Sequence, residues 1–284
     1  MTVRLVVDSS ADLSGALVRD LSIEVVPLKV RFGEEELLDG TELSPGEFWA
    51  RLRTSGITPQ TAAPAPGDFE KAFRKVLDEG ASGIVCVTLS SKVSATHQAA
   101  RIAARALSDH CPVAVVDSLS VSAGLANLSV AAARRAAEGA DLARVVAEAE
   151  ELRGDIAFYG AVETLEYLRR GGRIGAASAL VGTALSIRPL LRFEQGTVDV
   201  AGKVRTRRRA LEWLAERIEA DHPSGGITAF HADASDIDDL VKLLAAKLPA
   251  ERIEISLMGP VMGTHLGPGT VGVTYFRSPV EKTR

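Results

Sequence analysis

The chain has 284 residues, of which 46% are hydrophobic and 25% are charged, and its formal net charge is −4. This length and apolar content predict a globular protein with two domains and exclude a disordered chain. The small negative charge argues against nucleic acid as the main partner.

The cysteines and the lengths of the apolar runs favour the cytoplasm as the compartment of this protein. Cys86 and Cys111 lie within apolar segments and belong to no cysteine framework, which favours buried free thiols and a reducing cytoplasm. The N-terminal segment lacks the apolar core of a signal peptide, and no apolar run approaches the roughly 18 residues of a membrane span. We therefore expect a cytoplasmic protein without stable membrane insertion.

The first half of the chain alternates strands and helices. Strands are predicted at residues 4–7, 24–32, 83–89 and 113–116, and helices at 16–21, 44–52, 68–80, 94–108 and 122–138. Because short connections between such strands imply right-handed crossovers, the strands should pair in parallel. We predict an N-terminal α/β domain, residues 1–153, whose parallel sheet carries much of a ligand site at its carboxyl edge.

The pattern changes in the second half of the chain. Strands are predicted at residues 155–162, 190–200, 226–231, 253–258 and 270–276, with a turn at 194–196, and helices at 210–220 and 236–248. A mixture of hairpins and helices is typical of a mixed or antiparallel sheet covered by helices. We therefore predict a second α/β domain, residues 154–284.

Four polar or glycine-rich segments lie between these elements. They are residues 58–67 (TPQTAAPAPG), 89–96 (LSSKVSAT), 165–175 (LEYLRRGGRIG) and 258–269 (MGPVMGTHLGPG). Prolines stiffen a loop, and paired glycines let the backbone approach another element closely. In this order, and over essentially the whole chain, the four segments resemble the DegV family. Its members are bacterial fatty-acid-binding proteins, and several are the lipid-presenting subunit of a two-part fatty acid kinase.

The resemblance implies a protein that binds a long-chain fatty acid in an apolar tunnel and is not itself an enzyme. A separate ATP-dependent fatty acid kinase, its catalytic subunit, would convert the presented carboxylate into an acyl phosphate for phospholipid synthesis. The segment GGRIG lacks the spacing and the lysine of a phosphate-binding loop. We therefore expect no nucleotide and no other cofactor on this chain.

Thr61 lies in the proline-rich segment, where stiffness can hold its hydroxyl toward a ligand. A local turn bond is the alternative. The matching threonine of the family binds the lipid carboxylate, which favours the first role. Ala62 is also expected to be a ligand-binding residue. Ala62 and Ala65 stand where relatives often carry serine, so fewer hydroxyl groups are available to the carboxylate here.

Ser90, Ser91 and Ser94 follow a predicted strand where a helix begins. Free backbone N–H groups and the helix dipole favour an anion there. Capping of the helix by Ser94 is the structural alternative. Ser91 and Ser94 are the ligand-binding candidates of this segment.

His265 is predicted in a Gly/Pro-rich loop, where Gly263 and Gly267 let the imidazole approach another element. In the family the matching histidine contributes to the head-group network. Arg173 can pair with a carboxylate or a phosphate, bind backbone carbonyls between the domains, or contact a partner. No second His, Cys or carboxylate stands at ligand spacing, so no metal site is expected.

Lys203, Arg205 and Arg207 to Arg209 form a basic run in an acidic chain. Positive charge at a helix start is unfavourable for the helix dipole, so the run is either a solvated helix start or a surface for an acidic partner. In the family this region can meet the kinase. Lys203, Arg205, Arg207 and Arg173 are therefore candidates for docking.

Two other functions remain open. One is a binding module for another apolar acid without a kinase partner. The other is a serine lipid hydrolase that uses Ser91 or Ser94 with His265, although the sequence has no G-x-S-x-G nucleophile elbow.

Overall fold

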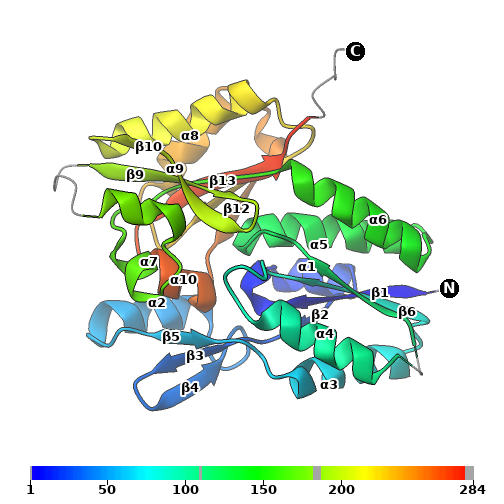
Figure 1. The fold of residues 1–284 in the computed structure, drawn as a ribbon. Coiled ribbons are helices and arrows are strands. Elements are labelled where there is room, and N and C mark those ends of the chain that lie inside the picture. The colour runs from blue at the N-terminus through cyan, green and yellow to red at the C-terminus, as the bar shows by residue number, and fades with distance from the viewer. Residues whose placement is uncertain (1, 109–110, 182–186, 279–284) are drawn as a thin grey trace.

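The computed structural model describes residues 2–108, 111–181 and 187–278. Within these residues the strands form a four-stranded, a six-stranded and a three-stranded sheet. Figure 1 shows the four-stranded sheet and its helices in the lower half of the molecule and the six-stranded sheet in the upper half.

The four-stranded sheet is parallel throughout, as predicted. Its order is β2 (Glu24–Val26), β1 (Val3–Asp8), β6 (Gly83–Thr88) and β7 (Val113–Asp117). Its helices are α3 (Pro66–Asp78) and α4 (Thr96–Ala106) on one face, and α5 (Ser122–Ala137) and α6 (Leu142–Leu152) on the other. Because helices cover both faces, β6 is buried along its whole length, which explains its uninterrupted apolar sequence.

The six-stranded sheet is mixed and covered by helices, as predicted for the second half of the chain. Its order is β10 (Thr197–Val204), β9 (Arg188–Glu194), β8 (Ile156–Ala161), β13 (Val271–Phe276), β11 (Ile227–His231) and β12 (Ile253–Leu257). Only β11 and β12 pair in parallel. Helices α8 (Arg207–Asp221) and α9 (Ile237–Ala245) cover its outer face. The division of the chain between residues 153 and 154 stays a prediction.

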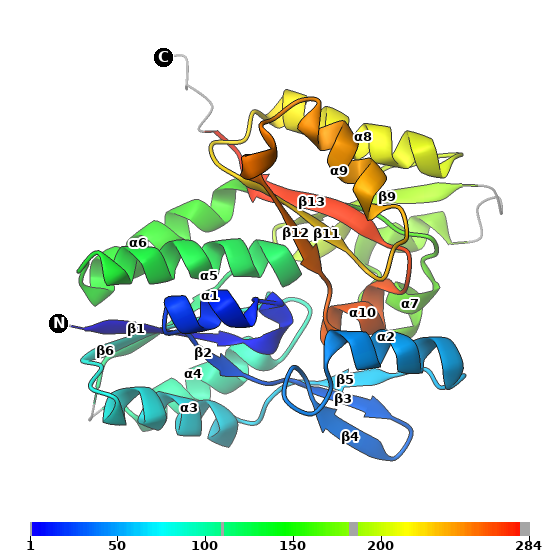
Figure 2. The same ribbon diagram turned by 180° about the vertical axis from the view of Figure 1, so that it is seen from behind.

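Helix α5 lies between the two large sheets (Figure 2). A Cβ on Gly124 would lie 3.3 Å from the Ile156 side chain and 3.4 Å from the Phe158 ring, so the helix rests directly on β8. Nearby, the Thr228 hydroxyl donates a hydrogen bond to Asn127 Oδ1 at 3.2 Å. One hydrophobic cluster therefore contains side chains of both sheets.

The prediction of one strand at residues 24–32 is wrong. This segment divides into β2, in the parallel sheet, and β3 (Lys29–Phe32), which pairs with β4 (Glu35–Leu38) in the small antiparallel sheet. Pro27 lies between the two strands. Proline has no N–H to donate to a strand ladder, so the strand ends there and the chain turns into a second sheet.

The third strand of the small sheet lies in a segment predicted as loop. Residues 58–67 contain β5 (Gln60–Ala62), which pairs with the other edge of β3. Thr61 lies opposite Val30 in this pairing. The sheet, as well as the prolines, therefore fixes the backbone of Thr61.

Helix α10 (Pro260–Leu266) carries His265, so the prediction of a loop around this residue is wrong. Pro260 suits the first turn of a helix, because its missing N–H would have no helical partner. Gly263 lets α10 approach α2 (Pro45–Thr54), since a Cβ there would lie 2.8 Å from the Trp49 ring.

The remaining elements are short. They are α1 (Gly15–Asp20), α7 (Glu166–Arg170), and the 3-10 turns η1 (Ser9–Ala11), η2 (Arg153–Asp155), η3 (Gly175–Leu180) and η4 (Ala250–Arg252). Cys86 and Cys111 are buried and free, as predicted. In the described part of the chain, no helix has the length and apolar character needed to cross a membrane.

Candidate functional site

An apolar cavity opens between the inner face of the six-stranded sheet and the N-terminal half of the chain. The space between its lining atoms, its mouth included, is about 790 Å³, of which the centres of water-sized molecules can occupy about 70 Å³. Its apolar walls include Leu89, Phe158, Leu168, Leu191, Phe230 and Met262. Arg192 also lines the cavity, but ion pairs with Glu194 at 3.0 Å and Asp199 at 2.6 Å neutralise its charge.

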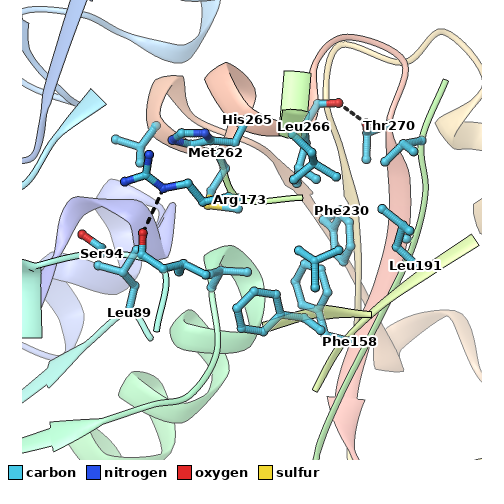
Figure 3. Close-up of a pocket in the computed structure, with 18 of the residues that line it drawn as sticks. Leu89, Ser94, Phe158, Arg173, Leu191, Phe230, Met262, His265, Leu266 and Thr270 are labelled. Atoms are coloured by element: carbon cyan, nitrogen blue, oxygen red, sulfur yellow. Dashed lines mark hydrogen bonds between the residues drawn. The ribbon is translucent and has the colours of Figure 1, made fainter. Parts of the chain in front are cut away.

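Four polar side chains gather at one end of this cavity. Thr61, Ser94, Arg173 and His265 come respectively from β5, the turn before α4, the segment after α7, and α10. Figure 3 shows Ser94, Arg173 and His265 on the side opposite Phe158. Four of the six predicted ligand-binding residues are therefore brought together, and the cavity is apolar along its walls with hydrogen-bonding groups at one end.

His265 and Thr61 are joined directly. The Thr61 hydroxyl lies 2.9 Å from His265 Nε2. Nδ1 of the same ring is buried, without a hydrogen-bond partner in the described residues. Removal from water, followed by the positive charge of Arg173, lowers the pKa of His265 to about 4. The imidazole is therefore neutral at pH 7 and acts through hydrogen bonds rather than as a cation.

Arg173 binds two backbone carbonyls. Its Nε donates to Val93 O at 3.0 Å and its Nη1 donates to Gly171 O at 2.6 Å. The bond to Val93 connects the two halves of the chain, as the structural alternative for Arg173 requires. The same side chain lines the cavity, where its charge favours an anion. A structural role and a ligand-binding role are therefore compatible at this position.

Ser94 lines the cavity but does not cap α4. The helix begins at Thr96, and its N-cap residue, Ala95, makes no side-chain bond. Ser94 Oγ instead accepts a hydrogen bond from the Thr96 N–H at 3.3 Å, and the two hydroxyl oxygens lie 2.8 Å apart. This local turn, of a kind that Ser and Thr commonly form, holds the Ser94 hydroxyl at the cavity wall.

Ala62 and Ser91, two of the predicted ligand-binding residues, lie away from the cavity. Both are exposed, Ala62 at the end of β5 and Ser91 in the turn after β6. The Ser91 N–H donates to the Asp117 carboxylate at 3.2 Å. Ser90 is buried, and its hydroxyl donates to the Gly196 carbonyl at 2.8 Å. The strand-to-helix segment therefore offers the cavity one serine, Ser94.

The residues of the basic run differ in their exposure and in their ion pairs. Lys203 and Arg205 are exposed and form no ion pair with the described residues. Arg207 is partly buried, with its Nε 2.7 Å from the Asp236 carboxylate and its Nη1 3.1 Å from Glu163. Docking by this run stays a prediction, and Arg207 would have to leave Asp236 to take part.

The polar end of the cavity lacks the arrangement of a serine hydrolase. The hydroxyl of Ser94 is bonded to Thr96, and the His265 ring is bonded to Thr61. In the described chain no carboxylate orients His265 Nδ1, as a nucleophile–base pair requires. Nor do the described residues include three or more His, Cys, Asp or Glu side chains grouped to hold a metal ion.

A cluster of three carboxylates, Asp8, Asp12 and Asp39, lies near the start of α10, and Asp12 is the member that bonds to it. No local sequence pattern predicts this cluster. Asp12 accepts hydrogen bonds from the Gly259 N–H at 3.0 Å and from the Ser122 hydroxyl at 2.7 Å. Burial raises the pKa of Asp8 to about 6 and the pKa of Asp39 to about 7. Burial and the charge of Asp39 also raise the pKa of Asp12. The start of the helix that carries His265 is therefore anchored on a cluster that resists full ionisation.

We expect Asp39→Asn to stabilise the protein more at pH 8 than at pH 5. A carboxyl group with a raised pKa binds its proton more tightly in the folded state, so stability falls as pH rises from 3.8 to about 7. Asparagine removes the charge and keeps an oxygen for the Ser9 hydroxyl, which Asp39 accepts at 2.6 Å. The pH-dependent gain should be on the order of 2 kcal/mol in the free energy of urea unfolding. Asp20→Asn, at an exposed carboxylate of α1, is the control, and an equal gain at both pH values would contradict the prediction.

Comparison with known proteins identifies the family. The family model "Uncharacterised protein, DegV family" matches residues 2–278. The chain is 38% identical over 277 residues to a DegV domain-containing protein of Streptomyces coelicolor, in a match that covers 95% of this chain and 97% of the relative. A fatty-acid-binding DegV family protein from Thermus thermophilus has a similar structure, with a TM-score of 0.89, 34% identity, and coverage of 98% and 100% of the two chains. A DegV lipid binding protein from Thermotoga maritima gives a TM-score of 0.84 at 32% identity, with coverage of 98% and 99%. The chain belongs to the DegV family, as the order of its four polar and glycine-rich segments indicates.

Proposed function

We propose that this chain binds a long-chain fatty acid in the cavity, with the carboxylate at Thr61, Ser94, Arg173 and His265. The observation that carries the proposal is the division of the cavity into apolar walls and one polar end. The similar structures from Thermus thermophilus and Thermotoga maritima, a fatty-acid-binding and a lipid-binding protein, support it.

Burial of the tail would supply most of the affinity. At about 0.8 kcal/mol per CH₂, a tail of roughly 16 carbons would gain on the order of 13 kcal/mol before the costs of association and ordering. The head-group contacts would decide which lipid binds, because a buried carboxylate without donors is unfavourable. Thr61 and Ser94 offer hydroxyl groups, and Arg173 offers a positive charge.

We further propose that the chain presents this carboxylate to the catalytic subunit of a separate ATP-dependent fatty acid kinase in the cytoplasm, which makes an acyl phosphate for phospholipid synthesis. Support comes from the absence of a phosphate-binding loop in the sequence and from the exposed charges of Lys203 and Arg205. Arg173, at the polar end of the cavity, would face the same partner. A binding protein for apolar acids without a kinase partner is the alternative.

Purified protein should release about one long-chain fatty acid per chain when denatured, because an apolar cavity retains an acyl tail. Gly160→Leu should reduce this amount, since a Cβ at this cavity residue lies 3.8 Å from the Phe230 ring and a leucine would fill the space. Mass spectrometry of the extracted lipid measures the amount. Gly225→Leu, where a Cβ meets nothing within 4 Å, is the control. A folded wild-type protein that carries no lipid and takes up none on titration would overturn the proposed function.

Thr61→Ala should weaken fatty acid binding by about 1–3 kcal/mol, because it leaves a buried carboxylate short of one donor. Binding of a fatty alcohol of equal length should change less. Titration of lipid-free protein with both ligands measures the difference. Ser91→Ala, at an exposed serine away from the cavity, should leave both affinities unchanged. Equal losses for acid and alcohol would mean that Thr61 acts on the structure and not on the head group.

Arg205→Glu should slow acyl phosphate formation with the kinase subunit and leave the lipid content unchanged, because charge steers encounter while the cavity is untouched. The wild-type rate should also fall as salt rises, since surface charges are screened over about 8 Å at physiological ionic strength. Lys71→Glu, the same reversal at an exposed residue of α3, is the control. Equal rates for the two variants would remove the basic run from the docking surface.

A further inference from the structure

The space around Gly171, and not its backbone conformation, requires a glycine at this position. Its φ of −72° and ψ of −10° are accessible to any residue. A Cβ at this position, however, would overlap His265 Nδ1 and lie 2.9 Å from His265 Cε1. The open side of the glycine is therefore filled by the imidazole ring.

The same residue also contacts the charged group of the site. The Gly171 carbonyl accepts a hydrogen bond from Arg173 Nη1 at 2.6 Å. The Gly171 N–H in turn donates to the Tyr167 carbonyl at 2.9 Å, which ties it to the end of α7. The residue that ends α7 thus contacts both His265 and Arg173.

The packing of His265 against Gly171 affects which of the two ring nitrogens carries the hydrogen. Nδ1 faces Gly171 and is buried without a hydrogen-bond partner in the described chain, whereas Nε2 lies 2.9 Å from the Thr61 hydroxyl. A hydrogen on Nδ1 would be buried without an acceptor, while a hydrogen on Nε2 has one in Thr61. With the hydrogen on Nε2, the Thr61 oxygen accepts and its own hydrogen is free to point into the cavity.

We propose that Gly171 is a positioning residue, which holds His265 with its hydrogen on Nε2 so that the Thr61 hydroxyl donates into the cavity. The inference rests on the proposed fatty acid site for its meaning, because a carboxylate accepts hydrogen bonds and donates none. An alcohol or an amide is neutral and carries hydrogens of its own, so it gains less from these donors and from the charge of Arg173. The packing of the ring thereby favours a carboxylate over other polar head groups.

The hydrogen position is tested first, by ¹⁵N NMR of the imidazole in lipid-free wild-type protein. We expect Nε2 protonated and Nδ1 unprotonated throughout pH 5–8, because the pKa of His265 lies at about 4 beside the charge of Arg173. A hydrogen on Nδ1 would overturn the inference. This result does not depend on fatty acid binding, so a failure of the proposed function is seen separately, as wild-type protein that takes up no fatty acid.

The role of Gly171 is tested by the ratio of fatty acid affinity to fatty alcohol affinity. Gly171→Ala should displace the ring and lower this ratio by about tenfold, the loss of one charge-assisted hydrogen bond. Gly46→Ala, where a Cβ meets nothing within 4 Å, should leave it unchanged. His265→Gln lacks the ring that meets the new methyl group but can donate to Thr61, so Gly171→Ala should cost much less in that background.

An unchanged ratio in folded Gly171→Ala protein would contradict the positioning role. Equal effects of Gly171→Ala in the wild-type and His265→Gln backgrounds would also contradict it, because a general disturbance of α7 would not depend on the imidazole. If Gly171→Ala fails to fold, the wild-type spectrum still tests the inference, because a hydrogen on Nδ1 overturns it.

Discussion

The inner face of the six-stranded sheet must be kept from water, and the arrangement of the molecule follows from that constraint. Phe158 stacks on Phe230 with ring centroids 4.5 Å apart, and its ring meets Phe193 at 6.3 Å in an edge-on contact. Helix α5 of the N-terminal half packs on one part of this face, and α10 helps to enclose the cavity that lies against another part. A sheet with one apolar face needs a second layer, and here the second layer leaves a cavity between the two halves of the chain.

Helix α10 connects this packing to the polar end of the site. Its start is held by the Asp12 carboxylate through the Gly259 N–H, and just before it the Met258 carbonyl accepts a hydrogen bond from Trp49 Nε1 at 3.0 Å. Near its end His265 reaches the Thr61 hydroxyl on the small sheet. The geometry of the polar end therefore depends on contacts at both ends of a seven-residue helix, so small shifts of this helix would alter it.

The electrostatic character of the site comes from one cation and several neutral groups. Because burial and Arg173 keep His265 uncharged, the ring does not add a second positive charge. Arg173 itself is held by backbone carbonyls at its Nε and Nη1 atoms. Such an end attracts an anion without burying a full unpaired charge, because Arg173 is exposed.

The sequence alone determined those elements whose burial can be predicted from the pattern of their own residues. The apolar run of β6 predicts a strand covered on both faces, and four ordered polar and glycine-rich segments indicate the family. The tertiary structure alone decided which side chains meet. It placed Ser94 and not Ser91 at the cavity, seated His265 on a helix against Gly171, and ended a predicted strand at Pro27. The physical reason is the separation of the residues along the chain. The periodicity of hydrophobic residues shows how one helix or strand is buried. A site is made by residues far apart in the chain, and their contacts depend on how whole elements pack.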